Sequence, residues 1–113
     1  MLKNYQEFLR HILDECDYIL SVIDEEKAFE DFINDDTLKR AVVRSLEIIG
    51  EASKQIPEDI CQKYSEIPWR NMAGLRDKLI HHYFGINYHI VWDVIKNKIP
   101  TIKEDVLTII DNQ

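Results

Sequence analysis

The sequence predicts an all-α fold, an up-and-down bundle of four main helices with one short additional helix. Apolar residues recur at the three- and four-residue spacing of a helix face along most of the chain, and no stretch shows the alternation of a strand. Only 3 glycines and 3 prolines occur in 113 residues, and 45% of the residues are hydrophobic. A chain of this length and composition forms one packed domain, so we expect residues 1–113 to fold as a single helical domain.

The first half predicts two long helices. One is expected over residues 3–25, where a single face carries the apolar positions Tyr5, Phe8, Leu9, Ile12, Cys16, Ile19, Leu20 and Ile23. A short helical turn is expected within 28–33. The second long helix is expected over 37–55, with Asp35 or Asp36 accepting hydrogen bonds from its first-turn amides. Pro57 and Pro68 both suit the first turn of a helix, because proline lacks an amide proton that would be unpaired there.

The next helix is expected over 69–83 and should end near Gly85, which can adopt the positive φ that helix ends commonly use. Asn87 can cap the following helix, and Ile86 is placed to pack on Val91 as a hydrophobic staple. These signals predict a tight corner between two helices.

Proline also predicts where this following helix ends. Its apolar stripe runs through Tyr88, Val91, Trp92, Ile95 and Ile99, and Pro100 then interrupts the backbone hydrogen bonding. Thr101 with Glu104 has the spacing of a capping box, so we expect a last helix to begin there.

The charge is negative overall but uneven along the chain. Lys plus Arg is 14 and Asp plus Glu is 21, a net charge of −7, so nucleic-acid affinity cannot come from the net charge. Residues 1–59 carry 7 basic and 15 acidic groups, residues 60–103 carry 7 and 3, and residues 104–113 carry 0 and 3. The basic excess of the second half is either a solvated helix face or a local binding site.

The cysteines and the hydropathy of the chain indicate in which cellular compartment the protein is expected. Cys16 and Cys61 lack the spacing of a zinc site or a disulfide framework. No apolar run approaches the roughly 18 residues of a membrane span, and the charged, amphipathic start does not resemble a signal peptide. We therefore expect a cytoplasmic protein that does not associate with membranes.

Polar side chains crowd the end of the helix expected over 69–83: Arg76, Asp77, Lys78, His81, His82 and Tyr83. Arginine offers a fixed fork for phosphate and histidine can move a proton near neutral pH, so the cluster suits phosphodiester chemistry. The alternative is purely structural, with Arg76 paired to a surface carboxylate and the histidines favoured by the helix dipole. A metal site of His81, His82 and His89 has little support, because adjacent histidines project about 100° apart on a helix. We expect neither metal nor cofactor.

Helical geometry separates the members of this cluster. Arg76 and Tyr83, seven residues apart, lie within about 20° of each other on a regular helix, whereas His81 lies about 140° from Arg76. Arg76 and His81 meet only if the helix distorts before Gly85, if Arg76 reaches across, or if a second protomer supplies the partner. A two-fold dimer would bring two arginines and two histidines into one cleft, so we expect a homodimer.

The pattern Arg76-x4-His81-x-Tyr83, followed by FGINYHIVW, resembles the signature of the HEPN superfamily, in its HepT-like toxin branch. The segments RSLEIIGEASKQIPED at 44–59 and EIPWRNMAGLRDKLIHHYFG at 66–85 are also similar to that branch, so the resemblance covers nearly the whole chain. It implies a HEPN-like helical bundle. It further implies a homodimeric, metal-independent endoribonuclease toxin, neutralised by an MNT-type nucleotidyltransferase antitoxin that is encoded beside it.

The resemblance also implies roles for particular residues. Arg76 and His81 match the catalytic pair, and Asp77 stands where the family places a polar supporting side chain, a position at which asparagine is at least as familiar. Tyr83 matches the tyrosine that the antitoxin can modify with AMP. A charged Asp77 beside an RNA phosphate would need a partner on the protein to neutralise it.

The chemistry expected from this pair uses the ribose 2′-hydroxyl. His81 would act as general base or acid, Arg76 would stabilise the charge on the scissile phosphate, and a 2′,3′-cyclic phosphate would result. DNA lacks the attacking hydroxyl, so the substrate is RNA, and the shaped, locally exposed strand of transfer RNA fits a small cleft on an acidic body. AMP on Tyr83 would add bulk and negative charge where RNA binds.

Two other interpretations stay open at this point. In one, the protein is a non-catalytic helical module that binds a nucleotide or the partner nucleotidyltransferase and only presents Tyr83. In the other, the polar cluster closes a dimer interface and has no separate activity.

Overall fold

All regular structure in the part of the chain that the computed structural model describes, residues 5–80 and 85–112, is α-helical. This confirms the predicted all-α fold. The helices are α1 (Tyr5–Val22), α2 (Phe29–Ile33), α3 (Asp36–Ser53), α4 (Glu58–Lys63), α5 (Trp69–Ala73), α6 (Leu75–Ile80), α7 (Tyr88–Asn97) and α8 (Ile99–Asp111). Within these ranges, no helix has the length and apolarity needed to cross a membrane.

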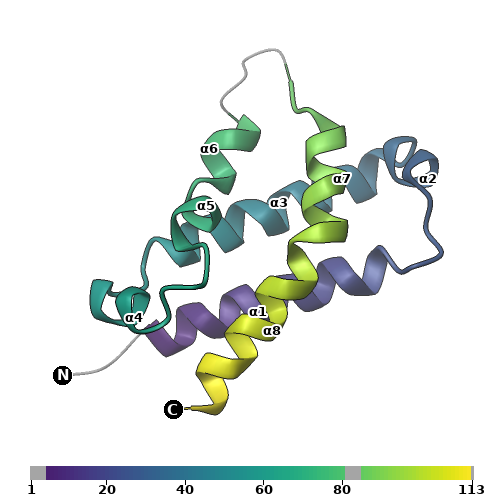
Figure 1. Ribbon diagram of the computed structural model, residues 1–113. Helices are drawn as coiled ribbons and strands as arrows, with labels where there is room; N and C mark the ends of the chain where they lie inside the picture. The colour runs from purple at the N-terminus through teal and green to yellow at the C-terminus, as the bar shows by residue number, and fades with distance from the viewer. Residues whose placement is uncertain (1–4, 81–84, 113) are drawn as a thin grey trace.

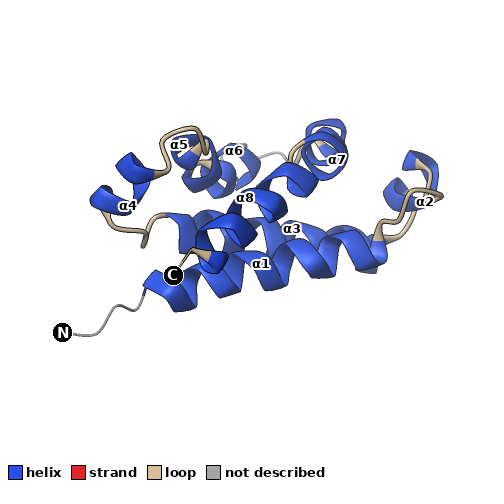
Figure 2. Cartoon of the chain, turned by 60° about the horizontal axis from the view of Figure 1, so that its bottom comes forward, coloured by secondary structure: helices blue, strands red, loops and turns tan. Residues whose placement is uncertain are grey.

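The helices form two layers. Helices α1 and α3 lie antiparallel and side by side in one layer, and α5–α6 and α7–α8 lie across them in the other (Figures 1 and 2). Helices α5 and α6 pack on α3, while α8 packs on α1. The chain therefore runs up and down the bundle four times, as predicted, and the short helices α2 and α4 lie at its two ends.

The core is built from the apolar faces that the sequence marks. Its fully buried side chains include Leu9, Ile12, Cys16 and Ile19 of α1, Val42, Leu46 and Ile49 of α3, and Ile99, Val106 and Ile109 of α8. Burying one such aliphatic side chain contributes about 1.5–3 kcal/mol. The long helices are therefore stable through packing rather than through their intrinsic helix propensity.

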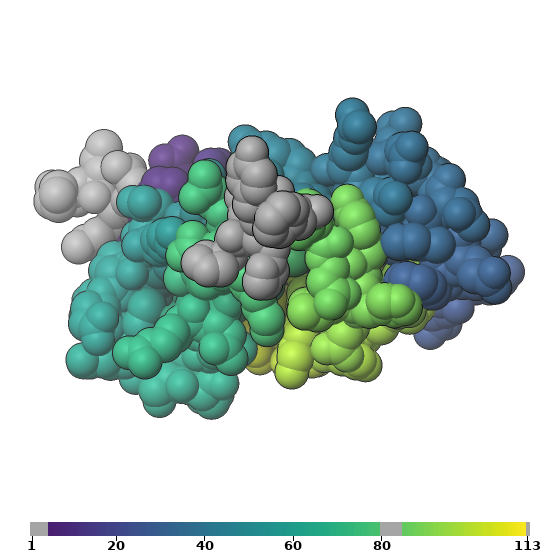
Figure 3. All heavy atoms as spheres, turned by 90° about the horizontal axis from the view of Figure 1, so that it is seen from above, coloured from purple at the N-terminus to yellow at the C-terminus, as the bar shows by residue number. Residues whose placement is uncertain are grey.

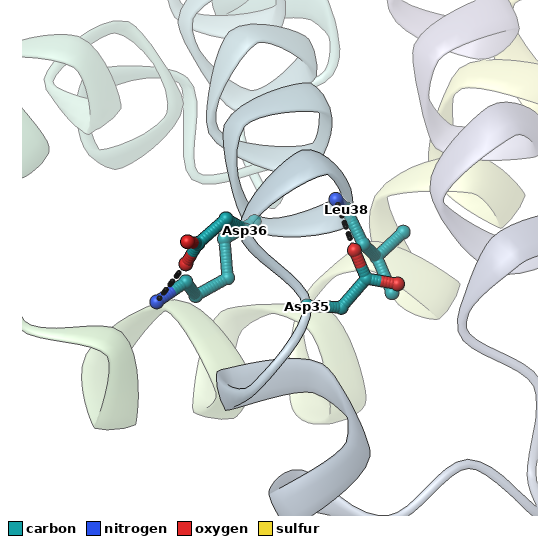
Figure 4. A network of polar contacts seen from close by, with 4 residues as sticks. Asp35, Asp36 and Leu38 are labelled. Atoms are coloured by element: carbon teal, nitrogen blue, oxygen red, sulfur yellow. Dashed lines mark hydrogen bonds and ion pairs between the residues drawn. The ribbon is translucent and has the colours of Figure 1, made fainter.

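Asp35, not Asp36, caps α3. Its Oδ1 accepts a hydrogen bond from the backbone N–H of Leu38 at 3.0 Å, while Asp36, the first helical residue, forms an ion pair with Lys39 at 3.2 Å (Figure 4). The other predicted bounds are close. Helix α1 ends at Val22 rather than at residue 25, and α3 ends at Ser53 rather than at residue 55. Residues 3 and 4 lie outside the described part of the chain.

The prediction of one helix over 69–83 is wrong. Helix α5 ends at Ala73 and α6 begins at Leu75, with Gly74 between them, and residues 81–83 lie outside the described part. Helix α3 approaches the chain closely at this break. A Cβ on Gly50 would stand 3.1 Å from the carbonyl oxygen of Met72 and 3.2 Å from the backbone nitrogen of Arg76. The chain changes direction where it crosses this glycine.

The two prolines stand one residue earlier than predicted. Pro57 and Pro68 are the N-cap residues of α4 and α5, so each precedes the first helical turn instead of lying in it. The reason for proline there is unchanged, because no backbone amide of an N-cap residue is needed for the helical hydrogen bonds.

The corner before α7 follows the sequence signals. Gly85 has a φ of 133°, and the Asn87 side chain accepts hydrogen bonds from the backbone N–H groups of His89 at 3.0 Å and Ile90 at 3.3 Å. Ile86 is half-buried against the core that contains Val91, as a hydrophobic staple requires. The Asn87 cap and the positive φ of Gly85 are confirmed, whereas the expected end of the preceding helix near Gly85 lies outside the described residues.

The predicted capping box at Thr101 and Glu104 is wrong. Helix α8 begins at Ile99 and has no side-chain cap, with Pro100 in its first turn. The N–H of Lys98 donates to the Val94 oxygen, and the N–H of Ile102 donates to the Lys98 oxygen. The backbone hydrogen bonds of the helix therefore continue on both sides of Lys98. Helix α8 consequently does not need a side-chain cap at Thr101.

Candidate functional site

Arg76 is held at the contact between the two layers. It is the second residue of α6, and its Nε lies 3.4 Å from Oε2 of Glu51 in the last turn of α3. This is the pairing with a surface carboxylate that the structural interpretation expects. The Arg76 side chain nevertheless remains 45% exposed and that of Glu51 52% exposed. A guanidinium carries five N–H donors, so one that is half-exposed and bound through Nε can still bind an anion at its tip.

Asp77 and Lys78 follow Arg76 directly and lie on the surface of α6. Asp77 lies in the first turn of the helix and is exposed, and Lys78 is also exposed. Neither forms an ion pair with another residue of the described ranges. An acidic group in a first helical turn is favoured by the helix dipole, which accounts for Asp77 at this position without a partner.

The remaining predicted site residues, His81 and Tyr83, lie outside the described residues, as does His82. The described chain ends at Ile80 of α6 and resumes at Gly85, just before α7 (Figure 1). The distances from Arg76 to His81 and Tyr83 therefore stay predictions, and so does the dimer that would bring two copies of the pair together.

A shallow hollow of about 440 Å³ adjoins the Arg76–Glu51 ion pair. It lies on the face formed by α1 and α3 and is lined by Phe8, His11, Arg44, Ile48, Glu51, Ala52 and Gln55. Glu51, His11 and Arg44 do not belong to any motif that the sequence marks as a candidate site. A signal was present, because Arg44, Ile48, Glu51 and Gln55 follow the three- and four-residue spacing of one helix face within the segment 44–59.

His89 takes part in an aromatic cluster between α2 and α7. Its ring stacks on Phe29 with 4.6 Å between centroids, and Phe32, Tyr88 and Trp92 complete the contacts between α2 and α7. Figure 3 shows the blue surface of α2 against the lime green of α7. Among the described residues, no group of three or more histidine, cysteine, aspartate or glutamate side chains could hold a metal ion.

Neither cysteine is a candidate nucleophile. Cys16 is fully buried in the core, and this burial, with a smaller effect of Asp17, raises the pKa of its thiol to about 12. Burial, together with Glu58 and Asp59, also raises the pKa of Cys61. Because the thiolate is the reactive form, both thiols are less reactive than a free cysteine near neutral pH.

Comparison with known proteins identifies the family. A family model described as ribonuclease HepT-like matches residues 5–109. A protein of Caldanaerobacter subterraneus subsp. tengcongensis, named a "Putative RNase", is 46% identical over 99% of both chains. A "Probable ribonuclease HepT" of Thermococcus cleftensis is 44% identical over 91% of this chain and 93% of its own, and a "Putative RNase" of Methanocaldococcus jannaschii is 50% identical over 90% and 84%. No solved structure matched the chain. The protein belongs to the HepT-like ribonuclease family.

Proposed function

We propose that this protein is a metal-independent endoribonuclease, the toxin of a cytoplasmic toxin–antitoxin pair, and that it acts as a homodimer. Membership of the HepT-like ribonuclease family supports the ribonuclease activity. The structural observation that carries the proposal is the Arg76 guanidinium, half-exposed and bound through Nε by Glu51. This places a fixed positive charge at the surface of an acidic protein, next to the segment that holds His81.

The reaction needs only the RNA and these side chains. His81 takes the proton of the ribose 2′-hydroxyl, and the 2′-oxygen then bonds to phosphorus as the bond from phosphorus to the 5′-oxygen breaks. The leaving 5′-oxygen takes a proton from His81 of the second protomer, so the products are a 2′,3′-cyclic phosphate and a 5′-hydroxyl. Arg76 stabilises the charge that develops on the phosphoryl oxygens. Asp77, exposed beside Arg76, has the supporting role of orienting the site.

Tyr83 is the proposed site of control. An MNT-type nucleotidyltransferase antitoxin would transfer AMP from ATP to the phenolic oxygen of Tyr83 and release pyrophosphate. The added phosphate and nucleoside carry negative charge and bulk into the region where the RNA phosphate binds, so modification stops cleavage. Transfer RNA is the substrate class that we favour, because its exposed loops present a shaped single strand.

The decisive experiment uses purified wild-type protein, His81→Ala and a control, His89→Ala, whose histidine packs against Phe29. Each is incubated with total cellular RNA in excess chelator, and fragments ending in a cyclic phosphate are measured. We expect the wild type and His89→Ala to cleave and His81→Ala not to cleave. Absence of cleavage by an unmodified, dimeric wild type would refute the ribonuclease and favour the non-catalytic module that presents Tyr83.

A further inference from the structure

A groove of about 490 Å³ lies on the side of α6 that faces α8, between α5–α6 on one wall and the junction of α7 and α8 on the other. We call it the α6–α8 groove and define it by Arg70, Asn71 and Lys78 on the first wall and Lys98 and Thr101 on the second. Its volume falls within the range of about 300–1,000 Å³ that is typical of ligand sites. Arg76 is not among the residues that line it.

The rim of this groove carries unpaired positive charge. Arg70, Lys78 and Lys98 are all exposed, and none of them forms an ion pair with a residue of the described ranges. They approach the groove from both walls, so an anion within it would meet cations on two sides. In a chain with a net charge of −7, such a cluster is a local attraction for an anionic ligand.

One end of the groove carries an acidic side chain instead of cations. Asp105 also lines it, and burial together with Glu66 and Glu104 raises the pKa of the Asp105 carboxyl. Asp105 follows Lys98 by seven residues, about 10 Å along α8. The anionic part of a ligand is therefore favoured at the Lys78 and Lys98 end, and the acidic end limits how far it extends.

The floor of the groove is apolar. It consists of Met72, Leu75, Val94 and Ile102, which are at most 7% exposed. Asn71 and Thr101 add polar side chains at the edge. An apolar floor, an amide, a hydroxyl and a cationic rim together match the base, the sugar and the phosphate of a nucleotide.

We propose that the α6–α8 groove binds the RNA strand beside the cleaved bond, with its phosphates on Lys78 and Lys98 and one base on the apolar floor. This inference rests on the proposed ribonuclease function. Arg76 and Lys78 are two residues apart and so lie on opposite sides of α6. A helix is about 10 Å across, so an RNA strand that passes around α6 can contact both Arg76 and Lys78 within a few nucleotides.

The test compares RNA lengths without cleavage. Fluorescence anisotropy measures the binding of labelled 2′-O-methyl oligonucleotides of two and ten nucleotides, alternating adenosine and uridine, which lack the attacking hydroxyl. For the wild type we expect much tighter binding of the longer strand. For Lys78→Gln with Lys98→Gln, two phosphate contacts are lost, so the Kd of the ten-nucleotide strand at 0.15 M salt should rise about tenfold and the salt slope should fall by about 1.4. The matched control, Arg40→Gln with Lys54→Gln, removes two exposed cations of α3 and its C-cap and should change little.

Three outcomes would contradict RNA binding in the groove. The wild type could bind both oligonucleotide lengths with equal affinity, or the double variant and its control could lose the same amount of affinity. The third is that a polyglutamate peptide binds more tightly than RNA and does so through Lys78 and Lys98. Cleavage of total cellular RNA by the wild type is measured in parallel. Groove-dependent binding without any cleavage of that RNA would refute the proposed ribonuclease and leave the groove standing as an RNA-binding site. Cleavage with binding that is independent of Lys78 and Lys98 would refute the groove alone.

Discussion

Arg76 on α6 and Glu51 on α3 join the two layers of the bundle at the candidate site, with 3.4 Å between Nε and Oε2. Both side chains are about half-exposed, and such pairs contribute at most about 1 kcal/mol to stability. The ion pair therefore adds little to the stability of the fold. Glu51 orients the guanidinium, and it also places a negative charge beside the position where an RNA phosphate would bind.

Removing this negative charge should tighten RNA binding. Glu51→Gln keeps the length of the side chain and a carbonyl oxygen that can lie beside Nε, and it abolishes the repulsion of a phosphate bound to Arg76. One unit charge at about 7 Å in water is worth about 0.6 kcal/mol, so we expect the Kd for a 2′-O-methyl oligonucleotide to fall about threefold at low salt. Anisotropy titrations check this, and the urea midpoint should stay unchanged.

The control for Glu51→Gln is Glu25→Gln, which makes the same charge change in the exposed loop between α1 and α2, at the other end of the bundle (Figure 1). Its Kd should match that of the wild type. If both variants tighten binding equally, only net charge matters, and Glu51 has no particular relation to Arg76.

Gly85→Ala should destabilise the corner before α7. Gly85 has a φ of 133°, which side-chain-bearing residues rarely adopt, and apart from its chain neighbours no atom of the described residues lies within 4 Å of the position of an added Cβ. The cost is therefore backbone strain alone, of about 1–3 kcal/mol. Urea unfolding at constant m value measures it, and an unchanged midpoint would show that this backbone conformation is not required.

Some features of the fold are encoded locally and could be read from the sequence. Asn87 caps α7 and Gly85 precedes it in a positive φ because each depends only on residues a few positions away. The periodic apolar positions of α1 and α3 are likewise buried as predicted, since the spacing of a helix face determines which side chains can meet the core.

Other features depend on contacts between distant segments. The segment around Gly74 packs closely on Gly50, more than twenty residues earlier, and no local signal in 69–83 could reveal this contact. The same holds for Glu51, which becomes part of the candidate site only because α3 packs on α6. Arg76 itself was found from its sequence pattern, but its partner required the structure.

The two cysteines should differ in reactivity towards an aromatic disulfide reagent at pH 8. Cys16 is fully buried with a pKa of about 12, whereas Cys61 is half-buried, so one thiol per chain should react in the native protein and two in urea. Cys61→Ser is the control and should leave no thiol reactive in the native state. Two reactive thiols in the folded wild type would contradict the burial of Cys16.

The raised pKa of Cys16 also predicts a loss of stability in alkali. The unfolded thiol loses its proton near pH 9.0 and the folded thiol only near 12, so above pH 9 the folded state binds more protons and its stability falls as pH rises. The slope is up to about 1.4 kcal/mol per pH unit. Comparing unfolding free energies at pH 8 and pH 10.5 for wild type and Cys16→Ala isolates this contribution, which should be missing from the variant. Parallel pH dependence in both proteins would contradict it.

Gly50→Ala sets two effects against each other and so tests how α3 positions Arg76. Gly50 lies inside α3, where helix propensity alone predicts that alanine is more stable by about 1 kcal/mol. The added Cβ, however, would stand 3.1 Å from the Met72 oxygen and 3.2 Å from the Arg76 nitrogen, and both are backbone atoms of packed helices that cannot turn aside. Overpacking of this kind costs about 1–3 kcal/mol, so we expect a net destabilisation.

The same substitution should reduce RNA cleavage by more than the loss of folded protein explains, because one of the two atoms that must give way is the backbone nitrogen of Arg76. Gly74→Ala is the matched control, since its Cβ would approach only the Arg70 and Asn71 oxygens, at 3.3 and 3.7 Å, within its own turn of chain. Urea unfolding and cleavage rates per folded molecule are compared for the two variants. A Gly50→Ala protein that is more stable and fully active would show that α5 and α6 move freely over α3, and that their packing does not position Arg76.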